Sequence, residues 1–156
     1  MRISDREVTN IKDILDIIKQ CDVCRIAIND EVVPYIVPMN FGVDVVDDEI
    51  YFYFHCASVG KKLDLIRKNP YVSFEMDCEH NLVLYENTMS CTFGYASVMG
   101  YGLMEFVEEN KVDALKIIMR QYHEEEFAFG LELLPVTTVL CLKVMEITGK
   151  RRNNKR

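Results

Sequence analysis

The residues best suited to chemistry lie in one stretch, which reads IYFYFHCASVGKKLD from Ile50 to Asp64. Lys61 and Lys62 fall where a helix is predicted to begin. The free amides and the dipole of a helix N-terminus attract anions, so two lysines there oppose the dipole unless an anion is bound. One interpretation is a phosphate site built from the Ser58 hydroxyl, backbone amides and both ammonium groups. The other is a solvated basic helix start.

The aromatic part of this stretch predicts a strand that is covered on both faces. Successive side chains of a strand point to opposite faces. One face carries three apolar residues and the other three aromatic ones, namely Ile50, Phe52 and Phe54 against Tyr51, Tyr53 and His55. A strand with one face in water would alternate apolar with polar residues. We therefore expect the second face to be covered by a partner subunit, by a flat ligand, or by a helix of the same chain.

A second candidate segment is the proline-containing strand from Val32 to Phe41. Pro34 and Pro38 cannot donate to a sheet ladder, which predicts an edge strand or a bulge. Free backbone groups on such a strand could pair with the carbonyls and N–H of a flavin pyrimidine ring. The alternative is simple protection of the sheet edge.

The six cysteines indicate a reducing compartment, where thiols stay free or serve chemistry. Cys21 and Cys24 form a single C-x-x-C pair, whereas a structural zinc site needs a second pair at comparable spacing. Cys78, His80 and Cys91 are too irregular a set to provide it. We expect no metal site.

Composition limits the functional classes further. The 156 residues are 49% apolar and 28% charged, which favours one soluble globular domain over residues 1–156. The net charge is −7, although five basic residues form a tail over 150–156, so the remaining body is strongly acidic and unsuited to nucleic-acid phosphate. No apolar run is long enough to span a membrane, and the charged start does not predict a signal peptide. We expect a cytoplasmic protein.

Hydrophobic periodicity predicts a mainly β fold with peripheral helices. Glycines at 94, 100 and 102 predict bends in a long strand. The polar segment 78–88 is predicted to be a loop. Short consecutive strands favour an antiparallel sheet that closes into a barrel. Strands are predicted over 23–29, 32–41, 49–56, 71–77, 91–107 and 136–147, and helices over 10–20, 61–69 and 110–122.

Several segments in this order resemble a known family. They include PYIVPMNF from Pro34, YFHCA from Tyr53, GKKLDLIR from Gly60, and YASVMGYG from Tyr95. In order and spacing, nearly the whole chain resembles the pyridoxamine 5′-phosphate oxidase-like flavin-binding split barrels. Within that group it is most similar to the 5-nitroimidazole resistance proteins.

The resemblance implies a homodimer of antiparallel six-stranded split barrels, with FMN, or alternatively FAD, in clefts between the subunits. It implies a flavin oxidoreductase that acts on a small planar acceptor such as a 5-nitroimidazole, or else a non-catalytic flavin-binding or storage protein. The chain has no tryptophan, which argues against oxidation of pyridoxamine phosphate itself.

Family members also imply which residues form the site. His55 would be catalytic and supply a proton to the acceptor; the alternative is a packed interface histidine. The C-terminal segment would reach the site of the other subunit. The implied cofactor-binding residues are Pro38, Met39, Asn40, Phe54, His55, Ser58, Lys61, Lys62, Tyr95, Ser97, Val98, Lys150 and Arg151.

Overall fold

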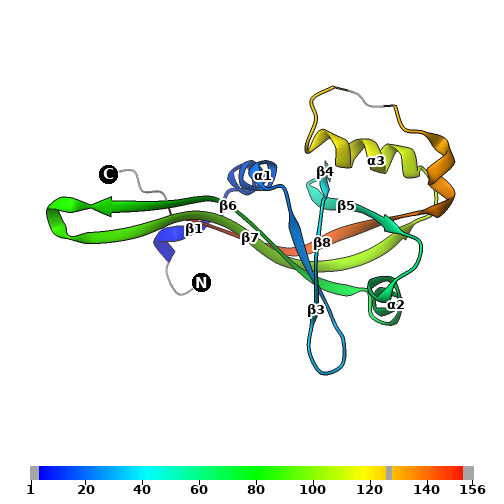
Figure 1. The fold of residues 1–156 in the computed structure, drawn as a ribbon, viewed down its shortest axis with the longest axis horizontal. Coiled ribbons are helices and arrows are strands. Elements are labelled where there is room, and N and C mark those ends of the chain that lie inside the picture. The colour runs from blue at the N-terminus through cyan, green and yellow to red at the C-terminus, as the bar shows by residue number, and fades with distance from the viewer. Residues whose placement is uncertain (1–3, 126–127, 153–156) are drawn as a thin grey trace.

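The structure is a computed structural model that describes residues 4–125 and 128–152. The described residues form one antiparallel sheet with three α-helices and three short 3-10 helices around it (Figure 1). The strands are β1 (Glu7–Val8), β2 (Cys24–Ile28), β3 (Tyr35–Met39), β4 (Gly42–Val46), β5 (Glu49–Ala57), β6 (Tyr71–Tyr85), β7 (Ser90–Val107) and β8 (Thr137–Arg152). The helices are α1 (Ile11–Gln20), α2 (Lys61–Lys68) and α3 (Lys111–Arg120), with 3-10 turns η1 (Ser4–Arg6), η2 (Glu86–Thr88) and η3 (Leu131–Val136).

The strand order is β3-β2-β6-β7-β8-β5-β4, and β1 pairs with β8 outside this path. The mainly β, antiparallel prediction is therefore confirmed. The count of six strands is not confirmed, because eight strands form among the described residues. β4 lies in a segment for which the sequence predicted no strand. β3 is an edge strand, as Pro34 and Pro38 predicted. Pro38 lies within the strand and would break a ladder on a second side, while Pro34 precedes it.

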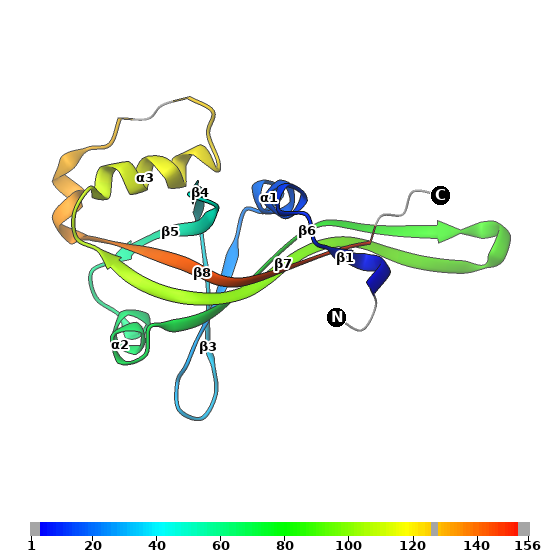
Figure 2. The same ribbon diagram turned by 180° about the vertical axis from the view of Figure 1, so that it is seen from behind.

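The helices cover different parts of the curved sheet (Figures 1 and 2). Asn10 caps α1 by accepting a hydrogen bond from the amide of Lys12, and α1 packs on β6 and β7. α3 packs over β4, β5 and β8. Its close approach depends on Gly42, where an added Cβ would lie 2.4 Å from the carbonyl oxygen of Ile117. The second face of β5 is thus covered in part by a helix of the same chain, one of the three alternatives stated above.

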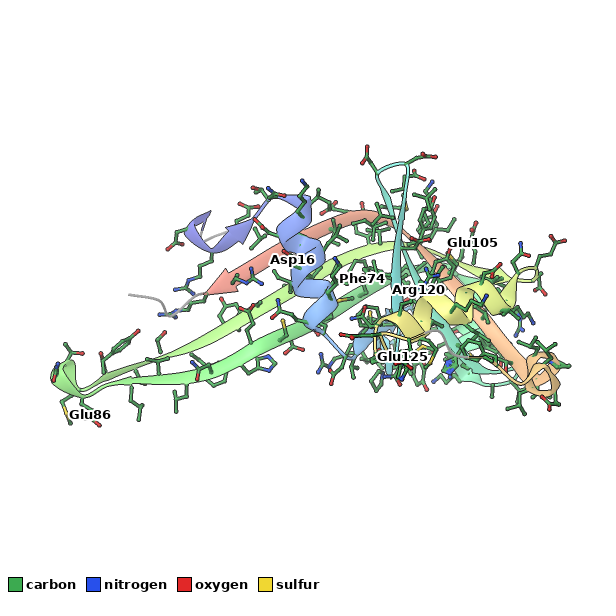
Figure 3. The ribbon with its side chains drawn as sticks, turned by 90° about the horizontal axis from the view of Figure 1, so that it is seen from above. Asp16, Phe74, Glu86, Glu105, Arg120 and Glu125 are labelled. Carbon is green, nitrogen blue, oxygen red and sulfur yellow. The ribbon has the colours of Figure 1, made fainter. Side chains whose placement is uncertain are left out.

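The prediction of a loop over 78–88 is wrong. β6 continues to Tyr85 and forms a long hairpin with β7 that extends beyond the rest of the sheet. Figure 3 places Glu86 at its far end. An extra residue in β6 between Cys78 and Asn81 breaks the period-two pattern, and Glu79 there has a φ of 59°. This bulge, which shifts the alternation by one residue, explains why the periodicity failed. We call residues 79–94 the arm.

The first three residues of the basic tail predicted over 150–156 belong to the sheet. Lys150, Arg151 and Arg152 are the last three residues of β8 and pair with β7, so the tail predicted over 150–156 begins after them at the earliest. Residues 153–156 lie outside the described residues. The pairing of β7 with β8 shifts register between Tyr101 and Gly102, beside one of the glycines that predicted a bend, but the extra residue is Met145 of β8 rather than a residue of β7. No helix among the described residues is long and apolar enough to cross a membrane.

Candidate functional site

The start of α2 is an exposed helix N-terminus without a side-chain cap. It follows the turn that leaves β5, and Gly60 occupies the N-cap position with a φ of 146°. Residues other than glycine rarely adopt this backbone conformation. The first amide groups of a helix lack a partner four residues back. The amide of Leu63 donates to the carbonyl oxygen of Gly60 at 3.0 Å, which leaves the amides of Lys61 and Lys62 to bind an anion. Ser58 lies exposed in the same turn.

The two lysines at this helix start have different environments. Lys61 Nζ lies 2.6 Å from Asp30 Oδ2 and 5.1 Å from the centre of the Tyr35 ring. The Asp30 carboxylate raises the pKa of Lys61. Lys62 is half-buried and forms no ion pair with any residue in the described part of the chain. The positive charge that remains available to a ligand is therefore that of Lys62.

His55 lines a cavity of about 260 Å³ between the end of β5, α3 and η3. His55 is exposed on its open side, but packing against these elements removes part of the solvation of the charged ring, and this partial burial lowers the pKa of His55. At neutral pH the ring is therefore neutral, with one donor and one acceptor nitrogen. The other lining residues are mostly apolar: Leu115, Phe129, Gly130, Leu133, Leu134 and Thr137. The cavity can hold a small apolar molecule beside one polar group.

The predicted residues of β3 and β5 lie on both sides of the sheet. Pro38 is exposed on the edge strand, whereas Met39 is 9% exposed and belongs to the core. Asn40 is exposed, and its side-chain amide donates to the carbonyl oxygen of Asp22 at 3.2 Å. Phe54 is fully buried in the core, on the opposite face of β5 from His55. Of Pro38, Met39, Asn40 and Phe54, only Pro38 and Asn40 have exposed side chains.

The face of the sheet opposite the core carries a second cavity, of about 500 Å³, across β2, β3, β6, β7 and β8. We call this the outer face. It carries the exposed apolar side chains of Ile36, Tyr71, Met99 and Tyr101. Its polar residues include Arg25, which contacts Glu75 and Asp77. No predicted site residue lies on the part of this face that lines the cavity, although the alternation of β6, with Phe74 and Met76 inward and Glu75 and Asp77 outward, is a signal for it in the sequence.

The remaining predicted residues form a separate cluster where β7 and β8 meet the arm, and this cluster spans both faces of the sheet. Tyr95, Ser97 and Lys150 lie on the face of Met99, whereas Val98 and Arg151 lie on the core face toward α1. Ser97 pairs with Lys150 across the two strands, and Val98, which is buried, pairs with Gly149. Lys150 Nζ lies 5.5 Å from the centre of the Tyr95 ring. Although burial opposes it, hydrogen bonding by Lys150 and Arg6 lowers the pKa of the Tyr95 hydroxyl.

Arg151 in this cluster is held by a bidentate ion pair with Glu79, with contacts of 2.8 and 3.2 Å. It also borders a polar cavity of about 300 Å³ beside η1 and β1. The cluster is therefore basic, aromatic and partly neutralised by the bulge residue of the arm.

One chain does not bring together the Tyr95–Arg151 cluster and the predicted residues at the start of α2, which we call the α2 group: Ser58, Lys61 and Lys62. Thr138 of β8 pairs with Cys56 beside the α2 group, while Arg151 follows 13 residues later in the same strand. At about 3.3 Å per residue the two positions are about 40 Å apart along the strand. Figure 2 shows the end of β8 on the opposite side of the molecule from α2. A ligand of ordinary size cannot contact both groups in a single copy.

Two features of the site gave no usable signal in the sequence. Asp30 neutralises Lys61 only because the β2–β3 turn folds back onto α2, and the apolar wall beside His55 comes from η3, more than 70 residues away. Among residues 4–125 and 128–152, no three histidine, cysteine, aspartate or glutamate side chains gather to hold a metal ion.

Comparisons with known proteins agree with this architecture. The pyridoxamine 5′-phosphate oxidase family model matches residues 10–151. A crystal structure from Bacteroides thetaiotaomicron VPI-5482, provisionally assigned as a 5-nitroimidazole antibiotic resistance protein, is 32% identical, with a TM-score of 0.81 and coverage of 93% of this chain and 86% of that one. A comparison with curated proteins finds no match.

More distant structures share the fold. The flavocytochrome Anf3 from Azotobacter vinelandii has a TM-score of 0.77 at 16% identity, with coverage of 99% of this chain and 72% of that one. An FAD and heme binding protein from Mycobacterium smegmatis has a TM-score of 0.76 at 17% identity, with coverage of 96% and 74%.

Proposed function

Because the chain belongs to the pyridoxamine 5′-phosphate oxidase family, we propose that it is a flavin-dependent oxidoreductase that binds FMN and reduces a small planar acceptor such as a 5-nitroimidazole. The relative from B. thetaiotaomicron is provisionally named for resistance to that class of compound. Two proteins with the same fold are named for a flavin or for FAD. The observation that carries the proposal is the uncapped start of α2 with Lys62 beside it.

This helix start fits a phosphate group. Free amides at the N-terminus of α2, the Ser58 hydroxyl and the Lys62 ammonium are the donors that such an anion requires. Lys61 adds less, because Asp30 already neutralises it. One phosphate suits this donor set, which is why we propose FMN rather than FAD. The edge strand β3, with Pro38 and Asn40 exposed, would hold the ring through its backbone groups.

When bound, FMN supplies the electron transfer from a reductant to the acceptor. The chain contributes position and protons. The apolar cavity beside His55 would hold the acceptor and exclude water. His55 would donate a hydrogen bond to the acceptor, and its protonated form would supply a proton at a ring nitrogen. Because burial lowers the pKa of His55, proton donation should become slower as the pH rises through that lowered pKa.

We further propose that the protein works as a homodimer whose sites are shared between subunits. The two groups of predicted residues are too far apart in one copy to bind one ligand. In a two-fold dimer, if one patch of the first subunit contacts a second patch of the partner, the reverse contact forms as well. The Tyr95–Arg151 cluster of each subunit could therefore complete the α2 group of the other. The exposed apolar residues of the outer face, including Met99 and Tyr101, supply a surface for such contact.

The arm extends the same surface. β7 has no extra residue, so Phe93 lies on the same face as Met99 and Tyr101. The bulge of β6 brings Leu82 and Leu84 onto that face, where they pair with Phe93 and Cys91. Leu82, Leu84 and Phe93 are 57%, 65% and 49% exposed.

Sedimentation of Leu84→Glu, with Asn81→Glu on the opposite face as its control, tests the role of the arm. We expect the dimer to weaken at least tenfold in Leu84→Glu only. Equal sedimentation of both variants and the unaltered protein would exclude the arm from the interface.

The proposed activity is tested on the purified protein in two steps. First, the protein is expected to be yellow and to release FMN on denaturation, identified by mass spectrometry. Colourless protein that binds neither FMN nor FAD in titration would overturn the proposal. Second, NADH or NADPH should bleach the bound flavin, and a nitroimidazole should restore its colour.

A non-catalytic flavin-binding protein is the outcome to distinguish. In that case His55→Ala would leave the rates of flavin reduction and reoxidation unchanged. If the protein is a reductase, His55→Ala should slow reoxidation by the nitroimidazole while FMN affinity stays within a few fold. The cavity beside His55 favours the reductase, since storage alone needs no space for an acceptor.

A further inference from the structure

Two thiols meet where α1 packs against the base of the arm. Cys21 is the C-cap residue of α1 and is 3% exposed. Cys78 is half-buried, in β6, at the residue where the bulge begins. Both Sγ atoms donate to one acceptor, the carbonyl oxygen of Ile17, at 3.3 Å for Cys21 and 3.8 Å for Cys78. Two donors that converge on one oxygen from neighbouring elements lie side by side.

We propose that Cys21 and Cys78 form a disulfide reversibly when a peroxide or another two-electron thiol oxidant reaches them. The inference is independent of flavin binding. Cys21 belongs to the C-x-x-C motif, but its structural neighbour is Cys78 rather than Cys24. Cys24 is fully buried, in β2, and Cys91 is exposed on the arm.

The chemistry with hydrogen peroxide balances in two displacements. The Cys78 sulfur, which is the more accessible of the two, attacks one peroxide oxygen, forms a sulfenic acid and releases one water. The Cys21 sulfur then attacks the Cys78 sulfur, which forms the S–S bond and releases the second water. The two thiols lose two protons and two electrons, and the peroxide gains them. A small-molecule dithiol reverses the bond by exchange.

The surroundings favour a slow, specific reaction. Burial raises the pKa of both thiols, so both are protonated at rest and donate to Ile17. Exposed Cys91 should therefore react first with bulky reagents, and the Cys21–Cys78 bond should form because its partners are already adjacent. The bond would tie the end of α1 to the base of the arm, next to the ion pair between Glu79 and Arg151.

Peptide mapping of the full-length protein under non-reducing conditions tests the proposal. In a Cys91→Ser background, hydrogen peroxide should yield a cross-linked peptide pair containing Cys21 and Cys78, which dithiothreitol abolishes. Cys78→Ser should abolish it, whereas Cys24→Ser, the matched change in the same motif, should leave its yield within twofold. Oxidised protein should also melt at a higher temperature than reduced protein, because a cross-link restricts the unfolded chain.

Each alternative outcome is decisive. If Cys78 ends as sulfinic acid or as a mixed disulfide while Cys21 remains a free thiol, the pair does not form and the proposal is wrong. A cross-link from Cys21 to Cys24 in equal yield would also overturn it. Because Cys78→Ser could destabilise the fold, circular dichroism is recorded for it, and Cys21→Ala provides a second variant that must also lose the cross-link.

Discussion

Substitution of Lys62 by Met should weaken FMN binding far more than the same change at Lys61. Lys62 is half-buried and has no carboxylate partner among the described residues, so its charge is available to a phosphate. A hydrogen bond to a charged group contributes about 1.5–3 kcal/mol, which corresponds to a loss of about 10- to 150-fold in affinity. Lys61 is exposed and already paired with Asp30, and exposed ion pairs contribute about 0–1 kcal/mol. Lys61→Met should therefore cost about fivefold or less.

The assay is quenching of flavin fluorescence, measured with both FMN and riboflavin. Riboflavin has the same ring system without phosphate, so Lys62→Met should reduce FMN affinity and leave riboflavin affinity nearly unchanged. Lys68→Met, at the other end of α2, is the matched control. If Lys62→Met reduces the affinity for FMN and for riboflavin equally, or if Lys61→Met reduces FMN affinity as much as Lys62→Met does, the phosphate does not lie where we propose.

Two other changes test the surroundings of this site. Gly60→Ala should weaken FMN binding through backbone strain, because residues other than glycine rarely adopt a φ of 146°; an added Cβ meets no atom within 4 Å, so no steric clash contributes. FMN titration and thermal melting of the same variant will show whether FMN affinity is reduced more than the melting temperature. Burial lowers the folded-state pKa of His55, so its contribution to stability is complete above the ordinary pKa of 6.5 and is lost as the pH falls through the lowered value. His55→Gln should therefore flatten slightly the decline of the melting temperature between pH 7 and pH 5, and an unchanged decline would contradict the partial desolvation of this ring.

The sequence was sufficient for the elements whose pattern is local. Asn10 and the apolar spacing of α1 predicted that helix, and Pro34 and Pro38 predicted an edge strand. The arm was missed because an extra residue in β6 breaks the period of two, so Leu82 and Leu84 follow the wrong alternation. A bulge depends on the partner strand, and no local pattern specifies it.

The site shows the same division between local and tertiary information. Lys61 and Lys62 are adjacent in sequence and look equivalent, yet only the fold brings Asp30 to Lys61. Likewise, the alternation of β5 predicted that both of its faces are covered. That pattern could not choose between a helix, a ligand and a partner, and α3 covers only part of the second face, at Tyr53.

A cofactor site shared between two subunits predicts a binding result that a site built from one chain cannot produce. If Lys62 of one subunit and Lys150 of the other bind the same cofactor, a dimer of Lys62→Met with Lys150→Met chains carries both substitutions in one site and none in the other. Random pairing of co-expressed chains should then leave about one quarter of all sites intact. Titration should show that fraction binding FMN with the unaltered affinity, although neither variant alone has any such site. A mixture of confirmed heterodimers without this fraction would mean that each site is built from one chain, and the Tyr95–Arg151 cluster would then have another role.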